Sequence, residues 1–127
     1  MTIYLELDEV LAIHDALVQG IAEIRDIGLI QSALARPQAT AFGEDAYPGV
    51  WEKGAALMQS LACNHGWVDG NKRTAWVATM TFLEVNGHPL DPAFDSDAAE
   101  DLVVAVADGR ISGVPEIAAE LPKFTER

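Results

Sequence analysis

The chain of 127 residues is poor in three things: cysteine, positive charge and long apolar runs. Its single cysteine, Cys63, excludes an internal disulfide, and the apolar helical run around it predicts a small buried thiol rather than a nucleophile or a metal ligand. With 8 Lys and Arg residues against 20 Asp and Glu residues, the net charge of −12 argues against a direct nucleic-acid binder, which needs a basic surface.

The start of the chain, MTIYLELDEV, is acidic and lacks the basic residues and the long apolar stretch of a signal peptide. No run of apolar residues reaches the length that crosses a membrane. We therefore expect a cytoplasmic protein that has no membrane segment.

Hydrophobic residues make up 50% of the sequence, enough to build one domain, residues 1–127, around one core. Apolar residues recur at helical spacing, and Pro, Gly and Asp residues mark the ends of the segments, with Asp26 as the expected N-cap of the second. The first predicted helix is capped by Asp8 and ends near Gly20. The others run from about Gly28 to Ala35, from Pro48 to residue 64, from 74 to Gly87, from near Ser96 or Asp97 to Gly109, and onward from Pro115.

One segment lacks the helical spacing of apolar residues. Residues 38–47, QATAFGEDAY, have strand-like residues around Gly43 and predict a small hairpin or flap. The expected fold class is therefore all-α, a compact six-helix bundle with a small flap or hairpin before the central helices.

Between the third and fourth predicted helices lies HGWVDGNKR, residues 65–73, which we call the motif. It leads into a helix whose first backbone N–H groups have no intrahelical acceptor and whose dipole favours negative charge. Asn71, Lys72 and Arg73 add donors at the same end, although positive charge there costs helix stability. This combination indicates a site for an anion such as phosphate.

The motif also has a purely structural interpretation. Asp69 could be the N-cap of the following helix, the two cations could be solvated, and His65 could be a cation at the end of the preceding helix. The two glycines, Gly66 and Gly70, favour the functional interpretation, because they interrupt one long helix and are expected to let the backbone approach a ligand closely.

The motif resembles the signature of the Fic/Doc family, whose Doc branch reads H-x-F-x-[DN]-[AG]-N-K-R. The residues that match are His65, Asp69, Gly70, Asn71, Lys72 and Arg73. Gly66 replaces the common proline, and Trp67 replaces the phenylalanine that plugs the core beneath the loop. The resemblance covers nearly the whole chain, through IHDALVQG, RDIGLIQSALARPQ and residues 47–62.

The resemblance implies a protein kinase, the toxin of a toxin-antitoxin system, that uses ATP and Mg²⁺ and stops translation by modifying elongation factor Tu. It implies that His65 is the base that accepts the hydroxyl proton and that Asp69 binds Mg²⁺. The residues that would hold phosphate oxygens are Gly70, Asn71, Lys72 and Arg73. A cognate antitoxin would restrain the enzyme through a C-terminal segment that folds into a groove on the toxin.

Lys72 separates the two branches of the family. The Fic pattern, H-P-F-x-[DE]-G-N-G-R, has glycine at this place, which leaves room for the inner phosphates and for delivery of AMP. A lysine fills that space, and the Doc branch resembles enzymes that bind the nucleotide the other way round and deliver the γ-phosphate. Transfer of AMP to a protein hydroxyl is the alternative, and a helical binding protein without activity is a further one.

A metal-dependent phosphohydrolase is a further alternative, because His14 and Asp15 form a His-Asp pair of the kind that contributes two metal ligands in such enzymes. Such an enzyme needs a cluster of further His and Asp ligands, and the chain contains only the three histidines His14, His65 and His88. We therefore expect His14 to lie on a helix surface or to be half-buried.

Overall fold

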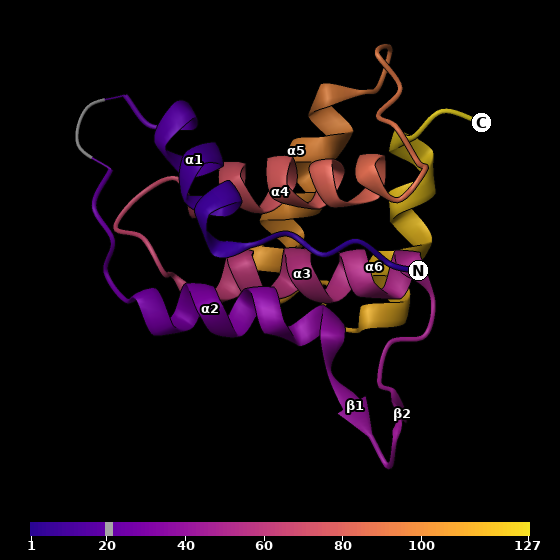
Figure 1. The fold of residues 1–127 in the computed structure, drawn as a ribbon. Coiled ribbons are helices and arrows are strands. Elements are labelled where there is room, and N and C mark those ends of the chain that lie inside the picture. The colour runs from indigo at the N-terminus through magenta and orange to yellow at the C-terminus, as the bar shows by residue number, and fades with distance from the viewer. Residues whose placement is uncertain (20–21) are drawn as a thin grey trace.

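The structure, a computed structural model, describes residues 1–19 and 22–127. These residues form six α-helices, two short 3-10 helices and one two-stranded hairpin, which confirms the predicted all-α class (Figure 1). The α-helices are α1 (Leu7–Leu17), α2 (Ile27–Ala35), α3 (Val50–Asn64), α4 (Asn71–Val85), α5 (Ser96–Ala107) and α6 (Val114–Glu120); the 3-10 helices are η1 (Arg36–Gln38) and η2 (Leu121–Phe124). None of the described helices is long and apolar enough to span a lipid bilayer.

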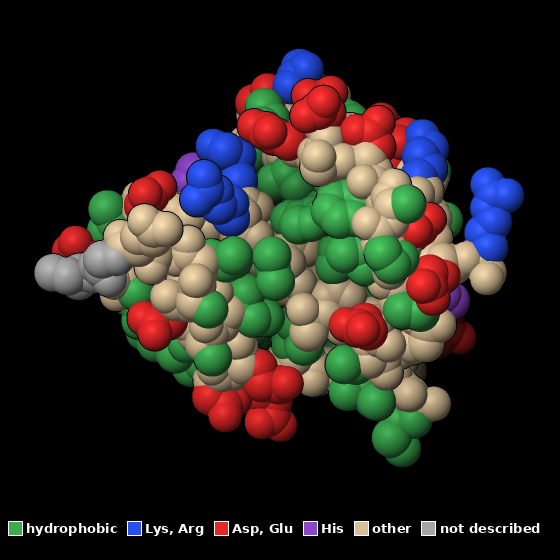
Figure 2. Space-filling model, turned by 90° about the horizontal axis from the view of Figure 1, so that it is seen from above, with side chains coloured by type: hydrophobic (Ala, Val, Ile, Leu, Met, Phe, Trp, Pro, Cys, Tyr) green, Lys and Arg blue, Asp and Glu red, His purple; other side chains and the backbone are tan. Residues whose placement is uncertain are grey.

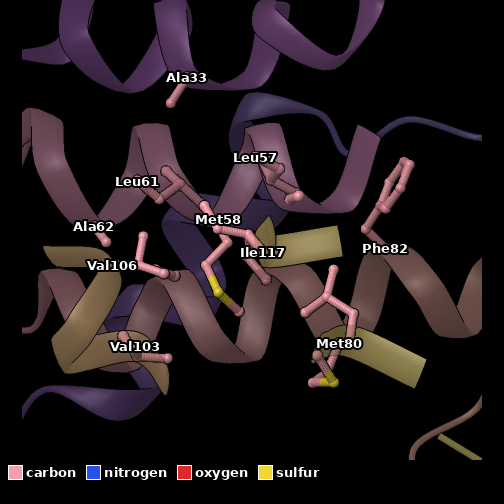
Figure 3. Close-up of a cluster of buried hydrophobic side chains, with 14 of the residues drawn as sticks. Ala33, Leu57, Met58, Leu61, Ala62, Met80, Phe82, Val103, Val106 and Ile117 are labelled. Atoms are coloured by element: carbon pink, nitrogen blue, oxygen red, sulfur yellow. The ribbon is translucent and has the colours of Figure 1, made fainter. Parts of the chain in front are cut away.

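α3 is the central helix of the bundle. It packs against α2, α4, α5 and α6, and its side chains are therefore buried on several faces. Figure 3 shows Leu57, Met58 and Leu61 of α3 among apolar side chains from the neighbouring helices. Burial of one such side chain contributes roughly 1.5–3 kcal/mol to stability. The core fixes the facing ends of α3 and α4, and the motif lies between those ends.

The predicted hairpin is present at residues 40–45, where β1 (Thr40–Ala41) pairs antiparallel with β2 (Glu44–Asp45). Phe42 and Gly43 at the turn have φ angles of 53° and 81°, the positive values of a type I′ turn. The Phe42 side chain is exposed, and the hairpin projects from the bundle (Figure 1).

Lys53 attaches the hairpin to α3. Its side chain is only 2% exposed, and Nζ donates hydrogen bonds to Asp45 Oδ2 at 3.1 Å and to the carbonyl oxygen of Tyr47. These oxygens replace the water that a buried ammonium group loses. The root of the hairpin is therefore held by an ion pair between the buried Lys53 and the exposed Asp45, whereas its tip is free of such contacts with α3.

The first helix begins and ends earlier than predicted. The backbone N–H of Glu6 donates to Glu9 Oε1 at 2.9 Å, so Glu6 is the N-cap and Asp8 lies inside the first turn. α1 ends at Leu17, and the predicted end, Gly20, lies outside the described residues.

Of the next three helix starts, two differ from the prediction and one N-cap is confirmed. α3 follows Gly49 as its N-cap, so Pro48 precedes the helix rather than starting it. α4 begins at Asn71, before the predicted residue 74, and the cations of the motif therefore lie in its first turn. Asp26 is the N-cap of α2, as predicted, and its Oδ1 accepts a hydrogen bond from the N–H of Gly28 at 2.9 Å.

Cys63 is exposed, and the prediction of a buried thiol is wrong. It lies in the last turn of α3, where its Sγ donates to the carbonyl oxygen of Val106 at 3.4 Å. Partial burial raises the pKa of the Cys63 thiol, and the opposing effect of the Arg36 charge is smaller. The thiol is therefore protonated at neutral pH and is a poor nucleophile.

Candidate functional site

The motif joins the C-terminus of α3 to the N-terminus of α4. His65 follows α3 in the left-handed region, with φ 52° and ψ 51°, and Gly70 precedes α4 with φ 80°. These two residues turn the chain, so that residues 66–69 form a loop at one end of the helix pair (Figure 1). The base and the carboxylate of the motif therefore both lie at this end.

The side chain of His65 is exposed. A left-handed backbone costs a residue other than glycine roughly 1–2 kcal/mol, and many helices end with glycine at such a position. Arg25 Nε donates to the carbonyl oxygen of His65 at 2.7 Å, and Arg25 Nη2 donates to that of Asn64 at 3.3 Å. Arg25 thus holds the backbone at the end of α3 and leaves the imidazole accessible.

The segment before α2 runs beside the loop and braces it. The backbone N–H groups of Arg25 and Asp26 both donate to the carbonyl oxygen of Gly66, at 2.9 and 3.0 Å. The N–H of Val68 donates to the carbonyl oxygen of Glu23 at 3.0 Å. These are strand-like bonds, so the loop is held by backbone pairing as well as by its own side chains.

The two glycines of the motif make room for side chains from neighbouring segments. A Cβ atom at Gly66 would lie 2.4 Å from Ile30 Cγ1, and one at Gly70 would lie 2.8 Å from Val18 Cγ2 and 3.2 Å from His14 Nε2. The two glycines let α2 and α1 pack against the loop from two sides. The binding of phosphate by the backbone at Gly70 stays a prediction.

Two hydrogen bonds between Trp67 and Asn71 hold the loop together, and the Trp67 side chain packs beneath it. The Trp67 side chain is 2% exposed and, as expected, fills the core beneath the loop. Asn71 Oδ1 accepts from the Trp67 N–H at 3.1 Å, and Asn71 Nδ2 donates to the Trp67 carbonyl oxygen at 2.8 Å. In this structure the Asn71 side chain braces the loop, which leaves its backbone N–H at the start of α4 as the donor that it could offer to a phosphate.

Lys72 and Arg73 lie exposed in the first turn of α4. Neither belongs to an ion pair within residues 1–19 and 22–127, where the three pairs are Lys53 with Asp45, Arg110 with Asp108, and Lys123 with Glu120. α4 also has no side-chain N-cap hydrogen bond. In Figure 2, blue Lys and Arg side chains gather over this end of α4. In a protein with net charge −12, such a group favours an anionic ligand.

Asp69 offers an exposed carboxylate beside these cations. Its Oδ1 accepts a hydrogen bond from the Gly70 N–H at 2.8 Å. Among the described residues, the group of three carboxylates close enough to hold a metal is Glu6, Asp8 and Glu9, and it does not include Asp69. A single protein carboxylate beside a phosphate site fits Mg²⁺, which is commonly bound by one or two carboxylates, substrate phosphates and water.

His14 is a residue of the site that the sequence analysis missed. It is only 1% exposed, so the prediction of a surface or half-buried position is wrong. Its ring stacks on Trp67, with centroids 4.4 Å apart and planes at 9°, and its Nε2 donates to the carbonyl oxygen of Asp69 at 2.7 Å. Asp15, by contrast, is exposed, so the His-Asp pair does not converge on one metal. One signal was available: His14 follows the buried Val10 by one helical turn and therefore shares its face.

A pocket of about 320 Å³ lies beside the loop, on the side of α1. Its lining is largely apolar and consists of Leu11, Ala12, His14, Asp15, Ala22, Ile24 and Trp67. Because His14 and Trp67 also support the motif, anything bound in this pocket would contact residues that hold the loop.

Comparison with known proteins agrees with this geometry. Residues 4–83 match the model of the Fic/DOC family, a span that contains α1 to α3, the whole motif and most of α4. The chain is also 53% identical over 124 residues to a protein named Toxin Doc from Mycolicibacterium smegmatis. The similarity covers 98% of this chain and 95% of that protein.

Proposed function

The chain belongs to the Fic/DOC family, and from this premise we propose that it is the toxin of a toxin-antitoxin system. We infer that it is a protein kinase, which transfers the γ-phosphoryl group of ATP to a hydroxyl of a translation factor. Elongation factor Tu is the proposed target, and its modification would arrest translation. The similarity to a protein named as a toxin supports the biological role, and the motif supports the chemistry.

Lys72 is the single observation that favours phosphoryl transfer over AMP transfer. It occupies the position of a glycine in the Fic pattern, lies exposed in the first turn of α4, and forms no ion pair within the described part of the chain. A cation here occupies the space in which the inner phosphates of ATP would otherwise lie. This supports the inverted orientation of the nucleotide, in which the γ-phosphate is nearest the acceptor hydroxyl.

The residues of the motif have different roles in the proposed reaction. His65 accepts the proton of the target hydroxyl while that oxygen forms a bond to the γ-phosphorus, and the bond to the bridging oxygen breaks, so that ADP leaves. Such a base contributes on the order of 10²- to 10⁴-fold in rate. The first N–H groups of α4, with Lys72 and Arg73, hold phosphate oxygens. Mg²⁺ held by Asp69 would neutralise charge on the phosphates.

An intact-mass spectrum of elongation factor Tu after incubation with ATP and Mg²⁺ tests the proposal. The wild-type chain should add the mass of one phosphoryl group, and Lys72→Gly should slow this addition on the order of 10²-fold. Lys123→Gly, which removes another exposed lysine, is the matched control and should act like wild type. Addition of an adenylyl mass by the wild-type chain would instead identify an AMP transferase, and an unmodified target would favour a binding protein.

We also propose that a cognate antitoxin restrains the enzyme through an apolar C-terminal segment in the pocket beside α1. The apolar lining and the contact with Trp67 and His14 support this place. Ala12→Arg, an exposed change in the lining, should leave the toxin active but prevent neutralisation by the antitoxin in a growth assay. Ala16→Arg, on the same helix but outside the pocket, is the control. Full neutralisation of the Ala12→Arg toxin would rule this pocket out.

A further inference from the structure

His14 has a buried donor that the proposed chemistry does not use. Its Nε2 lies 2.7 Å from the carbonyl oxygen of Asp69, a residue 55 positions further along the chain. A carbonyl oxygen can only accept, so Nε2 must bear the hydrogen. We propose that His14 is a positioning residue that orients the Asp69 carboxylate toward a divalent cation. This inference rests on the proposed function, which assigns the metal to Asp69.

The peptide unit between Asp69 and Gly70 is held at both ends. Its carbonyl oxygen accepts the hydrogen bond from His14, and its N–H donates to Asp69 Oδ1 at 2.8 Å. The carboxylate is therefore attached to the N–H of a peptide whose orientation His14 fixes. If the peptide rotated, the N–H would turn away and the carboxylate would lose its bond.

His14 itself has little freedom to move. Its ring lies nearly parallel to Trp67, at 9° and 4.4 Å between centroids, and it is 1% exposed. Gly70 packs near one edge of the ring, where a Cβ would lie 3.2 Å from His14 Nε2. α1 thus presents one rigid donor to the loop, and outer contacts of this kind set the orientation of metal ligands.

A purely structural role predicts something different. If His14 only filled space against Trp67, another ring of similar size would serve equally well, and no donor would be needed. His14→Phe keeps a ring for the stack and removes the donor. His14→Gln keeps an N–H donor and removes the ring. His14→Met, a flexible side chain without a donor, serves if the phenylalanine variant does not fold.

Two measurements test the proposal. Amide hydrogen exchange of Gly70, in the protein without nucleotide, should be at least about tenfold faster in His14→Phe than in wild type, and close to wild type in His14→Gln. The affinity for Mn²⁺ in the presence of ATP, measured by electron paramagnetic resonance, should fall about 10- to 100-fold in His14→Phe and largely recover in His14→Gln.

The outcomes separate this inference from the function on which it rests. Unchanged Gly70 exchange in His14→Phe and His14→Met overturns the positioning role. Faster exchange with unchanged Mn²⁺ affinity overturns it as well, because the peptide would then not orient the carboxylate. A wild-type protein that binds no Mn²⁺ in the presence of ATP would overturn the proposed metal site, and the inference with it.

Discussion

At the scale of single residues, His65 combines an unfavourable backbone with an exposed side chain. A glycine would adopt its φ of 52° without cost, so the imidazole is retained at the expense of stability. Such strain is typical of functional sites. The proposed role as base gives a reason for it.

We expect His65→Ala and His65→Gly both to lose phosphoryl transfer and toxicity, because neither side chain can accept the hydroxyl proton. His65→Gly should be more stable than His65→Ala by about 1 kcal/mol, because glycine tolerates the left-handed conformation. Growth on expression and urea denaturation measure the two effects. If His65→Ala is as toxic as wild type, another group is the base.

The sequence identified the residues of the site whose chemistry is concentrated in one short segment. His65, Asp69, Lys72 and Arg73 could be found because a base, a carboxylate and two cations precede a helix. The helical spacing from Val10 indicates that His14 is buried, but the sequence does not show what it binds, because its partner Asp69 lies 55 positions away. The structural reason for Gly66 could not be predicted either. The side chain that packs against it, Ile30, belongs to another helix.

At the scale of elements, the prediction succeeded where a segment buries an apolar face, and was less accurate where capping sets the boundary. All six helices and the hairpin were predicted from periodicity and turn residues. Gly87 follows α4 with a φ of 95°, because glycine readily adopts the left-handed conformation in which many helices end. The starts of α1 and α3 were displaced because Glu6 and Gly49 are the N-caps, and neither stands out in the sequence.

The hairpin gives a prediction about the protein target. Its tip exposes Phe42, while Lys53 fixes its root, so it presents an apolar anchor to a segment of the target. Phe42→Asn should raise the KM for the target roughly tenfold or more, since exposed aromatic anchors often dominate binding. Asparagine tolerates a positive φ and should keep the turn.

The KM for ATP should not change in Phe42→Asn, because the hairpin is separate from the motif in the fold (Figure 1). Steady-state kinetics with each substrate varied in turn make the comparison. An unchanged KM for the target would show that the hairpin tip is not where the target docks.

At the scale of the whole molecule, the candidate site is assembled from the first two thirds of the chain. α1, the segment before α2, the end of α3 and the start of α4 all contact the motif, and all lie within the residues that match the family. α5 and α6 pack against α3 and contribute to the core. The cations of the motif stand out because the molecule as a whole carries a net charge of −12.

The proposed function depends on the start of α4 holding the phosphates of ATP. A ¹H–¹⁵N NMR titration with ATP and Mg²⁺ tests it over the whole chain at once. We expect the largest shifts at residues 69–73, binding weakened about tenfold or more in Arg73→Ala, and unchanged binding in Arg110→Ala, an exposed arginine elsewhere. Shifts centred on another part of the molecule, or equal affinities for the two arginine variants, would contradict the account.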